Sequence, residues 1–177
     1  MLDAFSQHSA SVYIETMSTI QLFRRGAAAC ALVLSAACLS GESTGLTETR
    51  IEETNFASSL DVNLAASTKT ANGVYYRDLV VGTGKTVATG DSITVRYTGW
   101  LANGTQFDSN TTKPDPLIFK VGSGQVIQGF DEGLVGVKVG SQRQLIIPPS
   151  LGYGPYDYGP IPGNSVIVFK VEVVSAK

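Results

Sequence analysis

One helical pattern among many strand patterns is the feature that most constrains how this chain can fold. The apolar residues of the helical pattern, at 125–134, are Val126, Ile127, Phe130 and Leu134. From residue 73 onward, the rest of the chain reads as strands and turns, and apolar residues recur at every second position in 91–100 and 165–174, which is typical of strands with one buried face. Strands on both sides of one helix predict an α+β fold, in which an antiparallel sheet curls around that helix.

Turn signals separate the strand patterns from one another. The clearest alternation, at 91–100, places Ile93 and Val95 on the same face of a strand. Asn103-Gly104 then predicts a tight hairpin turn, because both residues tolerate the backbone angles that such turns need. The expected strands are residues 74–81, 91–100, 105–108, 117–121, 141–147 and 165–174.

Residues 1–37 have the pattern of a signal peptide. Arg24 and Arg25 are followed by an uncharged stretch, 26–39, that is shorter than the roughly 20 residues needed to span a membrane. Such a short apolar stretch behind basic residues is typical of an export signal. Met17 is an alternative start, because the residues before it carry acidic but no basic charges apart from one histidine.

Cys38 follows three small residues and resembles the lipidated cysteine of bacterial lipoproteins. Leu34 lies four residues before Cys38, whereas three is the usual spacing. Lipidation at Cys38 is the favoured interpretation, and soluble secretion or a retained anchor are the alternatives. We therefore expect an exported protein of the periplasm or cell envelope, with membrane contact only through a lipid anchor.

Residues 38–72 are rich in small and polar side chains, which predicts a flexible tether. Within it, 55–66 carries four apolar residues at which a short element could dock on the domain: Phe56, Leu60, Val62 and Leu64. The folded domain is expected to span 73–177.

The predicted domain contains neither histidine nor cysteine. His8, Cys30 and Cys38 all precede it, so it cannot hold a Ser-His-Asp triad, a Cys-His pair or a zinc site of nitrogen and sulfur ligands. The net charge of −2 and the lack of a basic cluster argue against a nucleic-acid partner. We expect chemistry that needs no metal and no cofactor.

Three blocks of sequence resemble the FKBP-type peptidyl-prolyl cis-trans isomerases in order and spacing. They are VRYTGWL with GTQFDS (95–109), VIQGFDEGL (126–134), and LGYG, IP and VFKVE (151–172). The resemblance covers roughly 73–177. It implies a twisted antiparallel sheet of five to six strands around one short helix, with an apolar pocket between them. The implied activity is isomerisation of X-Pro bonds, which would assist the folding of exported proteins.

The resemblance also implies which residues form the site. The groups that would act on the twisting amide are Tyr97, Asp108, Ile127 and Tyr153. The residues that would bind the proline substrate are Phe107, Leu117, Phe119, Val126, Phe130, Ile161 and Phe169. Proline-containing polypeptides would be the substrates and macrolides the inhibitors, and we expect a monomer.

Three features depart from the family pattern. Phe130 stands where a tryptophan usually forms the pocket floor, and Leu117 stands where an aromatic residue is common. The loop at 155–160 is one residue shorter and carries Tyr156 and Tyr158 in addition. These departures bear on macrolide affinity and substrate preference rather than on the activity itself.

Two other functions are compatible with parts of the sequence. A binding module would use the same pocket to hold proline-containing chains with little turnover. A hydrolase would need Asp108 and Asp131 as a pair of carboxylates, but Asp131 and Glu132 are expected on a solvated helix face.

Overall fold

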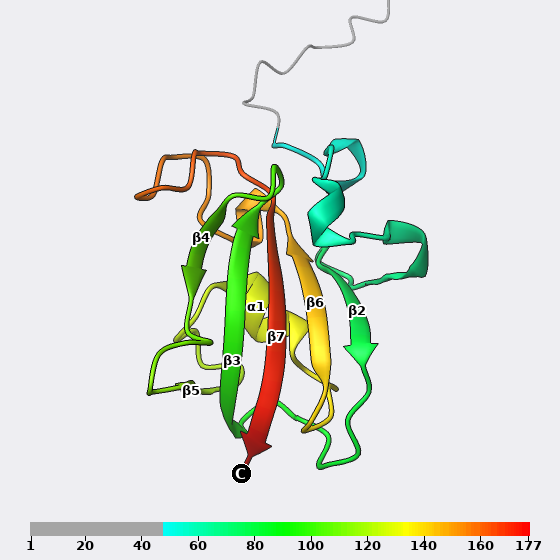
Figure 1. The fold of residues 1–177 in the computed structure, drawn as a ribbon, viewed down its shortest axis with the longest axis vertical. Coiled ribbons are helices and arrows are strands. Elements are labelled where there is room, and N and C mark those ends of the chain that lie inside the picture. The colour runs from blue at the N-terminus through cyan, green and yellow to red at the C-terminus, as the bar shows by residue number, and fades with distance from the viewer. Residues whose placement is uncertain (1–47) are drawn as a thin grey trace, which may run out of the picture. The chain divides into compact units, whose positions relative to one another are not determined.

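The computed structural model describes residues 48–177, which form one antiparallel sheet and one short α-helix (Figure 1). The predicted signal peptide, the alternative start at Met17 and the lipidation site at Cys38 lie outside the described residues. The strands are β1 (Thr68–Lys69), β2 (Tyr75–Val80), β3 (Ser92–Leu101), β4 (Gln106–Ser109), β5 (Leu117–Lys120), β6 (Gln142–Ile147) and β7 (Ile167–Ala176). The helix α1 is Gln128–Gly133, and 3-10 turns lie at Ile51–Glu53, Ser58–Leu60, Leu64–Ala66 and Pro149–Leu151. None of the helices within 48–177 is long and apolar enough to cross a membrane.

The sheet has seven strands, which is more than the five to six that the resemblance implied. Their order is β1-β2-β6-β7-β3-β4, and β5 pairs with the first half of β3 (Figure 1). The additional strand, β1, contains only two residues, which pair with Tyr75 and Tyr76 at the start of β2. Its sequence has no strand pattern of its own, so its pairing depends on the neighbouring strand.

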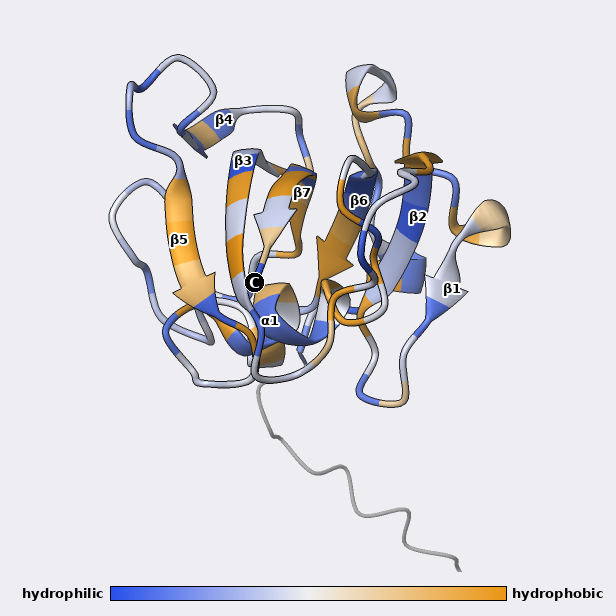
Figure 2. Ribbon diagram, turned by 90° about the horizontal axis from the view of Figure 1, so that it is seen from below, coloured by the Kyte–Doolittle hydropathy of each residue, from blue (hydrophilic) through white to orange (hydrophobic). Residues whose placement is uncertain are grey.

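The main core lies between the sheet and α1, which covers one face (Figure 2). Ile93 and Val95 of β3 are fully buried there, as their alternation predicts. The helix packs closely on β6 because two glycines face that strand. A Cβ at Gly129 would lie 2.4 Å from Ile147, and one at Gly133 would lie 2.7 Å from Leu145.

The helix begins three residues later than the sequence pattern predicts. Ile127 has an extended backbone with ψ 144°, and the helix starts at Gln128. The preceding turn is held outside the helix by Asp131, which accepts hydrogen bonds from the N–H groups of Gly122 (2.6 Å) and Gly124 (3.2 Å). Asp131 is therefore buried, with 7 % exposed, and does not lie on a solvated face as expected.

Residues 51–69 are packed on the sheet and do not form the flexible tether expected over this part of 38–72. Ile51 and Leu60 are 3 % and 2 % exposed, and they form a second apolar cluster with Ile146, Val166 and Val168. The four apolar residues singled out in 55–66 belong to this cluster. The packed segment begins earlier, at Ile51, because Glu52 is bonded to Lys69 and Tyr75.

Candidate functional site

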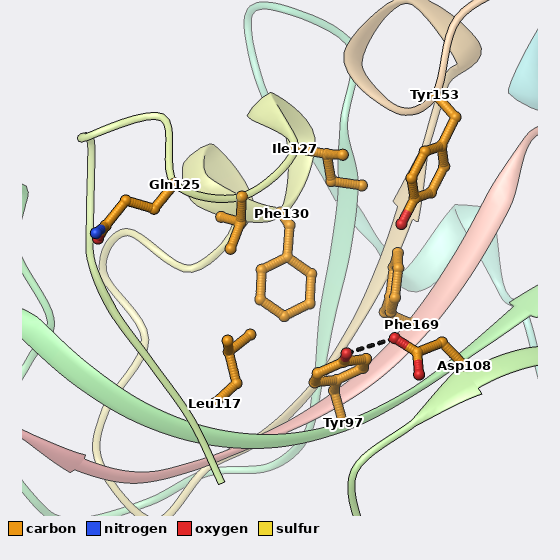
Figure 3. Close-up of a pocket in the computed structure, with 9 residues that line it drawn as sticks. Tyr97, Asp108, Leu117, Gln125, Ile127, Phe130, Tyr153 and Phe169 are labelled. Carbon is orange, nitrogen blue, oxygen red and sulfur yellow. Dashed lines mark hydrogen bonds between the residues drawn. The ribbon is translucent and has the colours of Figure 1, made fainter. Parts of the chain in front are cut away.

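An apolar pocket of about 460 Å³ opens between α1 and the concave face of the sheet (Figure 3). Its lining residues are Tyr97, Asp108, Leu117, Gln125, Val126, Ile127, Phe130, Tyr153 and Phe169. In Figure 3, Tyr153 and Asp108 approach the pocket from one side, and Leu117 and Gln125 from the other. The pocket size suits a small apolar ring with its flanking groups.

Aromatic rings form the floor of this pocket. The Phe130 ring meets Phe169 at 5.1 Å and Tyr97 at 5.8 Å between centroids, both edge to face. This edge-to-face geometry is a favoured one for aromatic pairs. Phe119 of β5 packs against Phe130, with 5.9 Å between the two ring centroids. Phe130 is therefore in contact with three other aromatic rings at the floor of the pocket.

Tyr97 and Asp108 supply the polar edge. The Tyr97 hydroxyl donates to Asp108 Oδ2 at 2.5 Å, and the Ser109 N–H donates to Asp108 Oδ1 at 2.8 Å. Burial and the bond to Asp108 raise the pKa of Tyr97 well above its usual range. Burial alone would raise the pKa of Asp108, but these bonds and the Lys113 ammonium at 3.5 Å lower it overall. The pair is a neutral phenol beside a carboxylate at neutral pH.

Asn110 holds Tyr97 in place, a role that sequence reasoning missed. Its side chain is buried, accepts the Tyr97 N–H at 2.7 Å and donates to the Val95 carbonyl at 3.1 Å. It thereby satisfies backbone groups of β3 where the partner strand changes from β5 to β4. The β3 residues between these two partner strands can be identified only from the strand pairing, so the sequence around Asn110 gives no signal for its role.

The backbone N–H of Ile127 forms no hydrogen bond with any described residue. It lies immediately before α1, where N–H groups have no intrahelical partner. Ile127 and Val126 both line the pocket. Their extended backbone therefore offers one free donor at the edge of an apolar cavity.

Tyr153 lies in the loop between β6 and β7, and its hydroxyl points into the pocket (Figure 3). Its ring stacks on Tyr158 at 4.9 Å and meets Phe107 edge to face at 6.2 Å. Burial, and then the negative charge of Asp108, raise the pKa of Tyr153. Ile161 is buried and exchanges two backbone hydrogen bonds with Tyr158, so it fixes the loop that holds this stack.

The structure brings eight of the eleven predicted site residues together around the pocket. The other three, Phe107, Phe119 and Ile161, lie behind the lining and support it. Gln125 also lines the pocket but was not predicted. Its side-chain oxygen accepts the Lys120 N–H at 2.8 Å, which holds the turn between β5 and α1. No three His, Cys, Asp or Glu side chains within 48–177 are grouped as metal ligands.

Curated relatives resemble this chain over its folded part. An FK506-binding protein of Neisseria meningitidis serogroup B is 47 % identical over 103 residues, which cover 58 % of this chain and 94 % of the relative. FK506-binding protein 4 of Gibberella zeae is 44 % identical over 117 residues, or 66 % of this chain. That match spans only 23 % of the fungal protein, which is much longer.

A solved structure and a family model agree with these matches. The crystal structure of FkpA from Escherichia coli superposes with a TM-score of 0.58 at 36 % identity, covering 63 % of this chain and 52 % of FkpA. The model described as FKBP-type peptidyl-prolyl cis-trans isomerase matches residues 83–174, which is just over half of the chain. The chain therefore belongs to the family of FKBP-type peptidyl-prolyl cis-trans isomerases.

Proposed function

We propose that this protein catalyses cis-trans isomerisation of X-Pro peptide bonds in exported polypeptides and so assists their folding. The observation that carries the proposal is the pocket itself, a cavity lined mainly by apolar and aromatic side chains together with a few polar groups. Membership of the FKBP-type isomerase family supports the same reaction. Proline-containing polypeptides are then the substrates.

The pocket favours the twisted amide over the planar one. An X-Pro bond rotates slowly, because amide resonance imposes a barrier of about 18–20 kcal/mol. At the transition state this resonance is lost and the amide is less charge-separated. An apolar site that excludes water therefore binds the twisted amide more tightly than the planar ground state. Phe130, Phe169 and Val126 hold the proline ring in this arrangement.

The polar groups at the edge orient the chain around that ring. The Ile127 N–H donates to one substrate carbonyl and the Tyr153 hydroxyl donates to another. Tyr97 and Asp108 face the twisting bond. No proton has to move, which is consistent with the pKa of Tyr97 lying above, and that of Asp108 below, its usual range.

A protease-coupled peptide assay on the mature protein tests this function. We expect cis-to-trans relaxation of a proline peptide to be faster than the uncatalysed reaction, which takes about 10–100 s. Peptide binding without any increase in rate would contradict the isomerase and favour the binding module.

The export part of the proposal is supported by the leader sequence alone. Arg24, Arg25 and the apolar stretch behind them direct export, and Cys38 is the proposed lipid anchor. Mass spectrometry of the mature N-terminus decides between the two main routes. A diacylated or triacylated Cys38 supports the anchor, and an unmodified residue there excludes it.

Macrolides of the FK506 type are proposed as inhibitors, since relatives of this chain are named for binding FK506. Phe130 gives a shallower and less polar floor than tryptophan. We therefore expect inhibition of the isomerase activity by FK506, but weakly. Full activity at saturating FK506 would contradict this.

A further inference from the structure

A second groove, of about 490 Å³, lies along α1 beside the catalytic pocket. Val126 and Val135 supply its apolar lining, and Gly122 and Gly124 contribute the turn before the helix. Val135 is 43 % exposed, so part of this apolar lining faces solvent. We call this cavity the flank groove.

The flank groove and the catalytic pocket adjoin at one residue. Val126 lines both cavities, with Ile127 and Phe130 on the pocket side and Val135 on the groove side. An extended polypeptide advances about 3.3 Å per residue. A chain whose proline lies on Phe130 therefore reaches the flank groove within a few residues.

The flank groove is acidic, and no basic side chain lines it. Both carboxylate oxygens of Asp131 accept from backbone N–H groups, at 2.6 and 3.2 Å. Glu132 accepts from the side-chain amide of Asn72 at 2.8 Å. These donors are neutral, and neither carboxylate belongs to an ion pair among residues 48–177. Two negative charges are thus hydrogen-bonded but not compensated.

We propose that the flank groove binds the segment of the substrate that adjoins the proline and selects a basic side chain there. The inference rests on the proposed isomerase function, since it extends the same binding surface. Val126 and Val135 contact the alkyl part of a lysine or arginine, and the charged end lies near Glu132 and Asp131. The protein then prefers proline sites with a basic neighbour.

Peptides with a single proline test this preference. Lysine, alanine or glutamate is placed at each position up to about four residues before and after the proline, a reach set by the rise of an extended chain. Rates are measured by NMR exchange, because added lysine would alter cleavage in a protease-coupled assay. We expect lysine on one flank to raise kcat/KM about two- to five-fold over alanine, the size of an exposed ion pair. High ionic strength should reduce this gain.

Charge reversal at Glu132 identifies the groove as the cause. We expect Glu132→Lys to remove the difference in kcat/KM between the lysine and glutamate peptides, because the new ammonium offsets the negative charge of Asp131. Glu172→Lys is the matched control, because it makes the same charge change at an exposed position of β7 whose neighbours Val171 and Val173 face the core. This control should keep the wild-type ratio.

The outcomes separate this inference from the function on which it rests. Equal kcat/KM for all peptides, or an equal shift in Glu132→Lys and Glu172→Lys, would overturn the flank groove while leaving the isomerase intact. If the wild-type protein isomerises none of the peptides, the proposed function fails and the inference fails with it.

Discussion

Tyr97 and Asp108 form a hydrogen-bonded pair of a neutral phenol and a charged carboxylate. The phenol stays protonated because its pKa is raised, and the carboxylate stays charged because its pKa is lowered. Neither group therefore changes its protonation state near neutral pH. In the proposed reaction the pair therefore acts through its orientation and its field, and not as a general acid or base.

Tyr97→Phe should slow the enzyme without abolishing it. The variant loses one hydrogen bond to Asp108, a loss of about 0.5–1.5 kcal/mol, and keeps the ring that packs on Phe130. We expect kcat/KM to fall about two- to ten-fold. Steady-state isomerase assays measure this, with Tyr75→Phe as the control, because the Tyr75 hydroxyl donates to Glu52 of the N-terminal segment and does not line the pocket. A thousand-fold loss would contradict the electrostatic role.

The sequence predicts which residues line the pocket, but not what holds them. Tyr97 and Phe130 stand in recognisable blocks, so their placement follows from the resemblance. Asn110 and Gln125 are different, because each accepts a hydrogen bond from the backbone N–H of a residue in another segment, Tyr97 and Lys120 respectively. These contacts depend on tertiary structure, which local patterns do not carry.

The seating of α1 on β6 sets the position of the pocket floor. Gly129 and Gly133 lie four residues apart and leave room for Ile147 and Leu145. Phe130, between them, is thereby fixed with its ring toward the pocket (Figure 3). The sequence predicts this helix but places its start too early, because the apolar side chains of Val126 and Ile127 fit the helical pattern although both residues precede α1 and line the pocket.

Gly129→Ala should disturb this seating. The added methyl group would lie 2.4 Å from the Ile147 side chain and 3.2 Å from the Leu151 carbonyl, so either α1 or Ile147 must shift. Overpacking of this kind costs about 1–3 kcal/mol, more than the gain in helix propensity of about 0.5–1 kcal/mol. Urea unfolding should show a net loss and the peptide assay a lower kcat/KM. Gln128→Ala, at an exposed helix position, should leave the free energy of unfolding unchanged.

The N-terminal segment is joined to the sheet by polar as well as apolar contacts. Glu52 accepts hydrogen bonds from Lys69 and Tyr75, both at 2.7 Å, and Leu60 accepts one from the buried Gln144. The sequence indicates part of this docking through the apolar residues of 55–66. It does not indicate the rest, because Glu52 and Lys69 look like ordinary tether residues until β2 brings them together.

Glu52→Gln should change how stability depends on pH. Hydrogen bonds from Lys69 and Tyr75 lower the pKa of Glu52 from 4.5 to about 2. A lowered folded-state pKa stabilises the protein above pH 4.5, and this contribution is lost as the pH falls towards 2. We expect the variant to be less stable than wild type by about 0.2–1 kcal/mol near pH 6, because the pair is partly exposed.

Urea unfolding at pH 6 and near pH 2 measures that difference, which should close in acid. Glu53→Gln is the matched control, because Glu53 pairs with Arg50 and both side chains are largely exposed. A gap that persists unchanged near pH 2 would show that Glu52 contributes through its packing and not through its charge.

The two apolar clusters share the central strands and so form one folded unit. In β7, Ile167 and Phe169 face α1, whereas Val168 between them faces the N-terminal segment. β6 alternates in the same way, with Ile146 on the side of the segment. Loss of either cluster therefore exposes one face of the same two strands, and we expect the segment and the sheet to unfold together.

Leu60→Ala tests this coupling. Its side chain is 2 % exposed, so truncation should lower the free energy of unfolding by about 2–5 kcal/mol. Trp100, the only tryptophan, packs against the same cluster and reports on it by fluorescence, while circular dichroism reports on the sheet. The two urea curves should coincide in wild type and shift together in the variant.

Val81→Ala, at a position 67 % exposed, is the control and should change stability by less than about 0.5 kcal/mol. A fluorescence transition that precedes the circular dichroism transition would instead show that the segment detaches while the sheet remains folded.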